Sequence, residues 1–576
     1  MWVCRRFPGS GARSEIVARD WRLKIMKRTP FDGLLLIFTA TAVLGVIVAY
    51  DRTRAGVKLV SILVGIGLFY SLAWGRRRNL PRVWGMLAGL SVVVAAYFLL
   101  MHDWQALPAD VDILTRIGLW WMGVRPSFTL PAIHPNSAGG LIAIFMPFQI
   151  VWGVYGWRKR RPAIWATAVF LGGVTLIGWL MTSSRASWLA FGMALGIGML
   201  WRFSLWAQTA EGWPRQRVFM TLLLLMIGIA AGFAFVLPGG FFALAGSVPG
   251  DATAGSRLVL YRQTLALIAD FPFTGGGLAA FPGLYSQYIA VTPFFQFNYS
   301  HNLWLDVWLE QTFLGLLALL GILGGSGALL WRTAAATSDL ARRKRRRALS
   351  LSRWATAMGL LILVVHSLVD DALYGGLGTP FLFVLPGIAV AAARRHEVER
   401  LRPFSFSAPV FVFLIAGLAA LTLQPTPTGR WYANRGATTM AQTELHDWPT
   451  QVWDDGRYAA QLTPARLVLQ QAIAIQPANR TAQSRLGLIA LLERDFETAV
   501  AYLQSAHDLD PDHRGIAKSL GYSYVWAGEW EQAVNLLTDI PEARREMKAY
   551  VHWWNEQGRP DLAALAEAQA AALKSK

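Results

Sequence analysis

The sequence predicts an all-α protein, with a polytopic bundle of about eleven transmembrane helices followed by a soluble domain of helical repeats. Three observations predict this class. Apolar runs that are long enough to cross a bilayer recur through residues 31–423. Lys and Arg are concentrated in every second loop between those runs. Residues 430–576 have the composition of a soluble domain and contain a repeat of 34 residues.

The composition separates this chain from ordinary soluble proteins. It has 576 residues, of which 54% are hydrophobic and only 15% are charged, whereas a soluble domain carries about 25% charged residues. The net charge of +19 lies mainly in short loops between apolar runs. It therefore favours a topology signal and contact with anionic membrane lipids over nucleic acid as a partner. The single cysteine, Cys4, excludes an internal disulfide and a cysteine-based metal site.

The N-terminal segment, residues 1–30, is expected to be cytoplasmic. Met26 precedes two basic residues and an apolar run, so either Met1 or Met26 could be the true start. The first apolar run lacks a clear small-residue cleavage site, which predicts an uncleaved membrane helix. The eleven apolar runs lie at about 32–50, 57–74, 83–101, 137–157, 162–182, 186–206, 217–237, 305–331, 354–373, 377–393 and 404–423.

The charge of the loops gives the orientation. Alternate loops on one side, counted with the N-terminus, hold 31 Lys and Arg residues, and the loops on the other side hold 8. The positive-inside rule therefore places the N-terminus in the cytoplasm. With an odd number of spans, the long loops 102–136 and 238–302 and the C-terminal domain at 430–576 are expected outside the cytoplasm.

The C-terminal domain contains an internal repeat. Leu486-Gly487 recurs as Leu520-Gly521, 34 residues later, and a partial unit precedes them. The period and the small residues resemble tetratricopeptide repeats, in which two antiparallel helices pack closely. Such a domain usually binds another protein, and the alternative is a helical lid that only covers the membrane domain. The other matched pairs are Phe496 with Trp530, Ala499 with Ala533, and Pro477 with Pro511.

Three arginines on the predicted outer side are candidates for binding a diphosphate. Arginine suits this role because its planar fork donates two parallel hydrogen bonds and its charge is permanent. Arg185 begins one apolar run, and Arg257 and Arg262 lie on a helical stretch of the second outer loop. The run Gly275–Gly277 follows that stretch without a Lys-Ser/Thr pair, so it predicts a rigid, closely approached turn and not a nucleotide-binding loop.

The pair His301-Asn302 is the strongest candidate for the reaction site. It lies where the long outer loop meets an apolar helix, and an imidazole there can accept a proton near neutral pH. Glu310 follows on the same helix, where a carboxylate inside the membrane needs a partner, and we expect a structural or orienting role for it.

Two further groups of residues are weaker candidates. His134 and Asn136 end the first outer loop, where Asn136 could also simply cap a helix. Asp370 and Asp371 lie at another predicted outer helix end. His366, about one turn before them, is expected to be a core histidine.

Taken in order, these motifs resemble the O-antigen ligase and polymerase superfamily of bacterial envelope glycosyltransferases. Each motif is short, but their order and spacing over residues 130–320 are specific. The chain departs from the family at Thr312 and Ser256, where Gly is usual or common, and at Tyr261, where Trp is common. The matching motifs are His134-Pro135-Asn136, Ser184-Arg185-Ala186, Ser256-Arg257-Leu258 with the Gly275–Gly277 run, and His301-Asn302 with Glu310 and Gly315.

The resemblance implies transfer of a glycan from an undecaprenyl-diphosphate-linked donor, without a metal or other cofactor, at the outer face of the bacterial cytoplasmic membrane. The acceptor would be a hydroxyl of a glycolipid, a growing glycan or a protein, since ligases, polymerases and protein O-glycosyltransferases share these motifs. The implied catalytic residues are His301, Arg257 and Arg185, and the implied substrate-binding residues are Arg262, Asn302, His134 and Asn136.

Two other classes of function remain open at the level of sequence. A transporter of lipid-linked glycans would need paired charges within the membrane and an internal repeat of helices, and no such repeat is visible. A membrane-anchored repeat scaffold without chemistry would leave the loop arginines and His301 unexplained.

Overall fold

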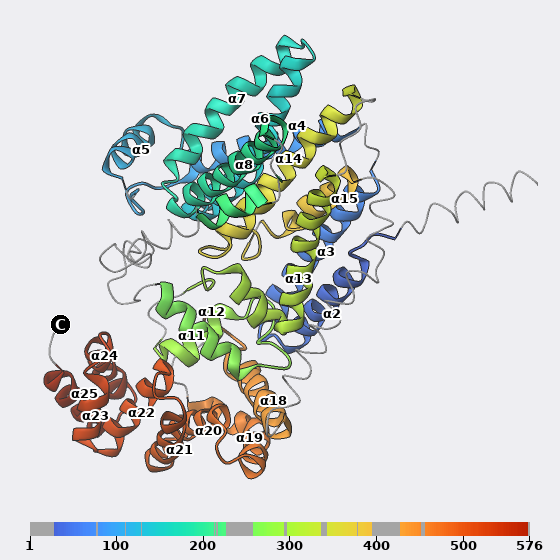
Figure 1. Ribbon diagram of the computed structural model, residues 1–576. Coiled ribbons are helices and arrows are strands. Elements are labelled where there is room, and N and C mark those ends of the chain that lie inside the picture. Colours follow the sequence, from blue (N-terminus) through green and yellow to red (C-terminus); the bar gives the residue numbers. More distant parts are fainter. Residues whose placement is uncertain are drawn as a thin grey trace, which may run out of the picture.

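The computed structural model is built from helices joined by turns, and no strand occurs among the residues it describes (Figure 1). The predicted runs at 404–423 and, for most of its length, at 217–237 lie outside these residues, as do Cys4 and Met26. The all-α prediction is confirmed. The described residues are 28–573, except 76–78, 110, 128–129, 212–213, 215–216, 226–256, 293–296, 336–342, 377, 394–426 and 451–455.

Nine of the predicted apolar runs correspond to helices in the described part of the chain. Five of these helices (α3, α4, α6, α7 and α13) are long and apolar enough to cross a membrane. The chain is therefore a multi-pass membrane protein. The nine are α2 (Asp32–Val48), α3 (Arg52–Ala73), α4 (Leu80–Met101), α6 (Pro135–Arg158), α7 (Pro162–Met181), α8 (Arg185–Glu211), α13 (Leu303–Ala335), α14 (Arg343–His366) and α15 (Val384–Ala392).

Helix α6 is the most buried of the long apolar helices. It packs against α4, α7, α8 and α14. Two glycines let its first turns approach their neighbours closely. A Cβ on Gly139 would lie 2.7 Å from Cβ of Ser184, and one on Gly140 would lie 2.5 Å from Cε1 of His366. The start of α6 therefore lies between the start of α8 and the end of α14.

Helix α13 is broken at Thr312, whose φ of 68° and ψ of 172° are not helical. The break leaves the carbonyl of Leu309 accessible, and the N–H of Gly276 donates to it at 2.7 Å. Gly277, with φ 102°, lies so close to α2 that an added Cβ would be 2.6 Å from Cα of Ala49. The predicted glycine turn thus fits between α2 and the break in α13.

The C-terminal helices form regular antiparallel pairs, as the repeat predicts (Figure 1). In three pairs a glycine of the first helix faces a leucine of the second, and the three leucines are 34 residues apart: Gly436 with Leu469, Gly487 with Leu503, and Gly521 with Leu537. The helices are α18 (Pro427–Glu444), the 3-10 helix η5 (Gly456–Leu462), α19 (Thr463–Ile475), α20 (Arg480–Leu492), α21 (Phe496–Leu509), α22 (Arg514–Ala527), α23 (Trp530–Leu537), α24 (Ala543–Glu556) and α25 (Pro560–Ala572).

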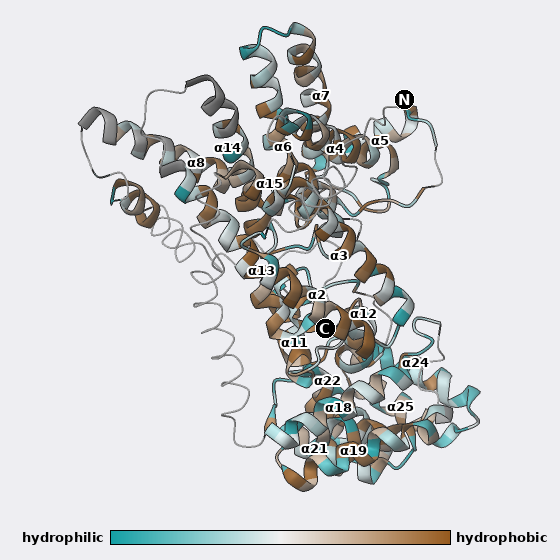
Figure 2. Ribbon diagram, turned by 90° about the vertical axis from the view of Figure 1, so that its right-hand side faces the viewer, coloured by the Kyte–Doolittle hydropathy of each residue, from teal (hydrophilic) through white to brown (hydrophobic). Residues whose placement is uncertain are grey.

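The second of the two loops predicted on the outer side lies between the bundle and the repeat domain (Figure 1). Its described parts are α11 (Arg257–Asp270), α12 (Phe281–Tyr285) and the π-helix η2 (Ser286–Ala290). One buried apolar cluster includes residues of α11, α12 and η2 together with residues of α18, α19 and α20. The bundle helices are mostly apolar and the repeat domain is mixed, as Figure 2 shows. The first predicted outer loop, 102–136, contains one more helix, α5 (Asp112–Val124), which the sequence analysis did not anticipate.

Candidate functional site

The loop that carries His301 is fixed by hydrogen bonds on both sides of this residue. His301 itself has a φ of 55°, in the left-handed region that non-glycine residues rarely adopt. Asn302 caps α13, because its Oδ1 accepts the N–H groups of Trp304 at 3.1 Å and Leu305 at 3.2 Å. Its Nδ2 donates to the carbonyl of Leu368 at 3.1 Å. The amide of Asn302 thus holds the loop in place, a role that the sequence analysis did not assign to it.

His301 faces a buried carboxylate from the loop after α14. Its Nδ1 lies 3.6 Å from Oδ1 of Asp370, which is an ion-pair distance slightly too long for a hydrogen bond. The carboxylate is fully buried, whereas 23% of the His301 side chain is exposed. Burial by itself would raise the pKa of Asp370, but His301, together with His366 and Arg257, holds that pKa well below its usual value. The buried carboxylate of Asp370 thus lies at ion-pair distance from the imidazole of His301.

Arg257 reaches the same place from α11. It is the first residue of that helix, and its Nη1 donates to the carbonyl of Val369, next to Asp370. One turn later the hydroxyl of Tyr261 lies 3.1 Å from the carbonyl oxygen of His301 and 3.0 Å from that of Leu368. These contacts connect α11 both to the His301 loop and to the end of α14.

His134 completes the cluster from the start of α6. Its ring centroid lies 6.3 Å from that of His301, and the ring of Tyr299 lies 4.5 Å from His301 on its own loop. His134 caps α6, because its Nδ1 accepts the N–H of Asn136 at 3.3 Å. The alternative reading, in which Asn136 is the cap, is therefore wrong.

The other two predicted arginines differ in how closely the structure associates them with this cluster. Arg185 is exposed at the first position of α8, and the preceding Ser184 packs against Gly139 in the second turn of α6. It therefore lies at the same end of the bundle as His134. Arg262 is exposed on α11, five residues after Arg257 and on a different face of that helix.

Two known families match parts of this chain. Residues 173–323 match the family described as O-antigen ligase, and residues 490–552 match a tetratricopeptide repeat family. The bundle therefore contains a region similar to O-antigen ligases, and the C-terminal part contains tetratricopeptide repeats. No curated protein and no solved structure matches it.

A second polar cluster of the bundle lies next to the histidine site. Glu310 is paired with Lys58, whose Nζ is 2.6 Å from Oε2 of Glu310. The same Nζ lies 3.7 Å from the ring centroid of Tyr374. The ion pair supplies the partner that a carboxylate within the membrane requires. Burial raises the pKa of the neighbouring Asp371 to about 7, although Lys58 opposes the rise.

Sequence reasoning gave too little weight to Asp370 and missed Tyr261 and Lys58 as partners of the site residues. Asp370 was a candidate only because it ends an apolar run, and no local pattern indicates that it meets His301. Lys58 was counted as a loop charge. Among the residues that the structure describes, no group of three or more His, Cys, Asp or Glu side chains is placed to hold a metal ion.

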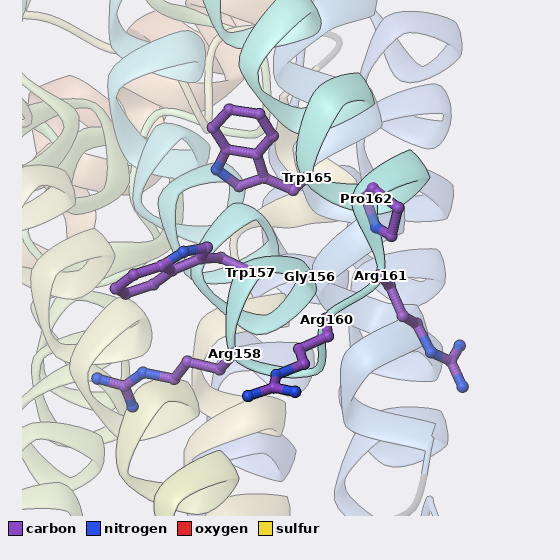
Figure 3. Close-up of a pocket in the computed structure, with 7 residues that line it drawn as sticks. All are labelled: Gly156, Trp157, Arg158, Arg160, Arg161, Pro162 and Trp165. Carbon is purple, nitrogen blue, oxygen red and sulfur yellow. The ribbon is translucent and has the colours of Figure 1, made fainter.

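A pocket of about 540 Å³ lies at the opposite end of α6 from His134, at the turn to α7 (Figure 3). Its lining offers cations and aromatic rings but no carboxylate or imidazole. The pocket therefore suits contact with lipid headgroups, and its lining has no side chain that could transfer a proton. The lining residues are Gly156, Trp157, Arg158, Arg160, Arg161, Pro162 and Trp165.

Proposed function

We propose that this ligase domain transfers a glycan from an undecaprenyl-diphosphate-linked donor to an acceptor hydroxyl at the outer face of the cytoplasmic membrane. The observation that carries the proposal is the convergence of His301, Asp370 and Arg257 at one end of the bundle. A proton acceptor with its own carboxylate, next to a fixed cation, is what this transfer needs.

In the proposed reaction, His301 accepts the proton of the acceptor hydroxyl as its oxygen attacks the anomeric carbon of the donor sugar. Asp370 stabilises the resulting imidazolium. The bond between the anomeric carbon and the diphosphate oxygen breaks, and the diphosphate leaves with the electron pair. Arg257 and Arg185 compensate the charge that develops on it. Arg262, His134 and Asn136 are proposed to contact the glycan or the headgroup, and Asn302 to hold the loop.

The acceptor class and the orientation of the protein belong to the same proposal. A glycolipid, a growing glycan or a protein could each present the hydroxyl. The 31-to-8 split of basic residues supports a cytoplasmic N-terminus and an outer repeat domain. The domain limits proposed are 1–30, 31–423 and 430–576, although α18 already begins at Pro427.

The test is the release of undecaprenyl diphosphate by the purified protein in lipid vesicles that contain lipid-linked glycan extracted from its own host. We expect release by the parent protein and a loss on the order of a hundredfold or more for His301→Ala. His301→Gln separates two roles, since an amide can donate or accept a hydrogen bond but cannot take the proton. Parental release by His301→Ala would refute the proposed site.

A further inference from the structure

The first helices of the repeat pairs share one face of the domain, and the ligase domain's outer loop lies against it. We call this face the inner surface and define it by Asn434 and Glu444 on α18, Arg485 on α20 and Lys518 on α22. Each of these four side chains contacts a residue between 270 and 290 of the outer loop. In tetratricopeptide domains this is the surface expected to bind a partner.

The strongest contact is made by Asp270, the last residue of α11. Its Oδ1 accepts hydrogen bonds from Nη2 of Arg480 and from Oγ1 of Thr481, both at 2.7 Å. Its Oδ2 accepts one from Nη2 of Arg485 at 3.0 Å. Burial would raise the pKa of Asp270, but the two arginines outweigh burial and lower it. An ionised, buried carboxylate with this many donors fixes the end of α11 on the repeat domain.

The middle of the loop is held by α18 and α20. The hydroxyl of Tyr288 donates to Oε2 of Glu444 at 2.7 Å, and the guanidinium of Arg485 lies 3.2 Å from the centroid of the Tyr288 ring. Oδ1 of Asn434 accepts the N–H groups of Phe273 at 3.0 Å and Thr274 at 3.3 Å. These contacts involve backbone and side chains alike, so they define one placement of the loop.

The far end of the loop is held by α22 and α24. Nζ of Lys518 donates to the carbonyl of Ala290 and pairs with Glu546 at 2.7 Å. Oγ1 of Thr292 donates to Oε2 of the same Glu546 at 2.9 Å. The backbone at Gly515 lies so close to the carbonyl of Tyr288 that no side chain fits there. The inner surface is therefore filled by the chain's own segment.

We propose that the ligand of the inner surface is the outer loop itself, and that the repeat domain thereby positions Arg257 and His301 for transfer. Arg257 and Asp270 are the two ends of α11, a rigid helix about 20 Å long. Thr292 precedes His301 by nine residues. A partner protein would have to bind another face of the repeat domain. This inference rests on the proposed function.

The experiment combines a distance measurement with transfer kinetics on the full chain in lipid vesicles. Spin labels are placed at two exposed positions, Leu265→Cys on α11 and Leu509→Cys on α21, in a Cys4→Ser background. The test variants are Asp270→Asn and the milder Arg480→Gln, with Arg480→Lys as the conservative partner. The control is Arg559→Ala, which removes an exposed ion pair with Asp561 in the same domain.

We expect a narrow distance distribution in the parent protein and the control, and a broad one in Asp270→Asn and Arg480→Gln. We also expect kcat for undecaprenyl diphosphate release to fall tenfold or more in these two variants, with KM for the donor within about twofold, and to recover in Arg480→Lys. A broad distribution with parental kcat would overturn the inference and leave the proposed function intact. Lost kcat with a narrow distribution would also overturn it, and a parent protein that releases no undecaprenyl diphosphate would refute both.

Discussion

Asp370 lies 3.6 Å from His301, and the proposed role of His301 as proton acceptor depends on this buried carboxylate. The sequence predicts His301, Arg257 and His134 as site residues from their local motifs, since each begins or precedes a helix. It cannot predict that residue 370 meets residue 301, because that contact depends on how α13 and α14 pack. The same reason explains why the role of Asn302 as a cap bonded to Leu368 was not foreseen.

The first prediction concerns the charge of Asp370. Asp370→Asn keeps the shape of the side chain but removes the charge that stabilises a protonated His301. We expect turnover to fall on the order of a hundredfold, with thermal stability close to that of the parent protein. Kinetics of undecaprenyl diphosphate release check this. Asp371→Asn, its neighbour, is the matched comparison, and an equal loss in both variants would argue against a specific pairing with His301.

The second prediction concerns Arg257. Arg257→Ala removes both a fixed cation and the hydrogen bond to the carbonyl of Val369, so transfer is expected to be lost. Arg257→Lys restores the charge without the planar fork and should recover activity only in part. Arg262→Ala, on another face of α11, should be milder. Full activity of Arg257→Lys would show that charge alone suffices.

At the scale of elements, the hydrophobic pattern predicted nine of the described helices, most of them with ends displaced by a few residues. The two exceptions are α14 (Arg343–His366), predicted at 354–373, and α15 (Val384–Ala392), predicted at 377–393. It treated 305–331 as one span, whereas α13 is broken at Thr312. The sequence signal for this break is Thr312 itself. It stands at a position where the O-antigen ligase family usually has Gly, and Gly is the residue that tolerates such a φ. The short helix α5 was missed because it lies in a loop that the search for membrane-length runs passed over.

The third prediction concerns the glycine turn in that break. Gly277→Ala places a methyl group 2.6 Å from Cα of Ala49 at a φ of 102°, so the turn must shift and α2 and α13 must separate. We expect a lower unfolding midpoint and reduced transfer, because the same turn follows α11. Gly173→Ala, with no atom within 4 Å of the added group, should be neutral or slightly stabilising. Equal unfolding midpoints and equal transfer rates in the two variants would show that the space around Gly277 is not as tight as the structure indicates.

At the scale of the whole molecule, the bundle and the tail share buried apolar contacts. The composition correctly divides an apolar part from a soluble part, but the buried cluster shared by α11, α12, η2 and α18–α20 crosses that division. Composition cannot reveal such a cluster, since its loop members and its tail members are separated by more than a hundred residues in the chain. Removal of 427–576 should leave membrane insertion intact while exposing apolar side chains of the outer loop.

The fourth prediction is a pH dependence of the contact between loop and tail. Burial raises the pKa of Glu444 from 4.5 to about 7. Between these values the folded state retains a proton that the unfolded state has released, so this group's contribution to stability falls as pH rises. Glu444→Gln removes the titration. The free energy of unfolding of Glu444→Gln, measured relative to that of the parent protein, should therefore rise between pH 5 and pH 8 by on the order of 3 kcal/mol. A difference between the two proteins that stays the same at both pH values would contradict this prediction.

The fifth prediction concerns orientation. A reporter enzyme that is active only outside the cytoplasm should be active when fused after Lys576, because the charge split and an odd number of spans place the tail outside. The same reporter inserted at the turn between α6 and α7, after Arg160, should be inactive. The reverse pattern would place the histidine site in the cytoplasm.

The contacts between residues 270–292 and the inner surface limit which chimeric proteins can be built from this chain and related chains. Asp270 is matched to Arg480 and Arg485, and Thr292 is matched to Glu546. A tail without these arginines would leave the buried Asp270 without a cation, and a loop without Asp270 would leave the buried Arg485 without a carboxylate. Loop and tail should therefore be exchangeable only as one cassette, and over evolutionary time they should be inherited and altered together.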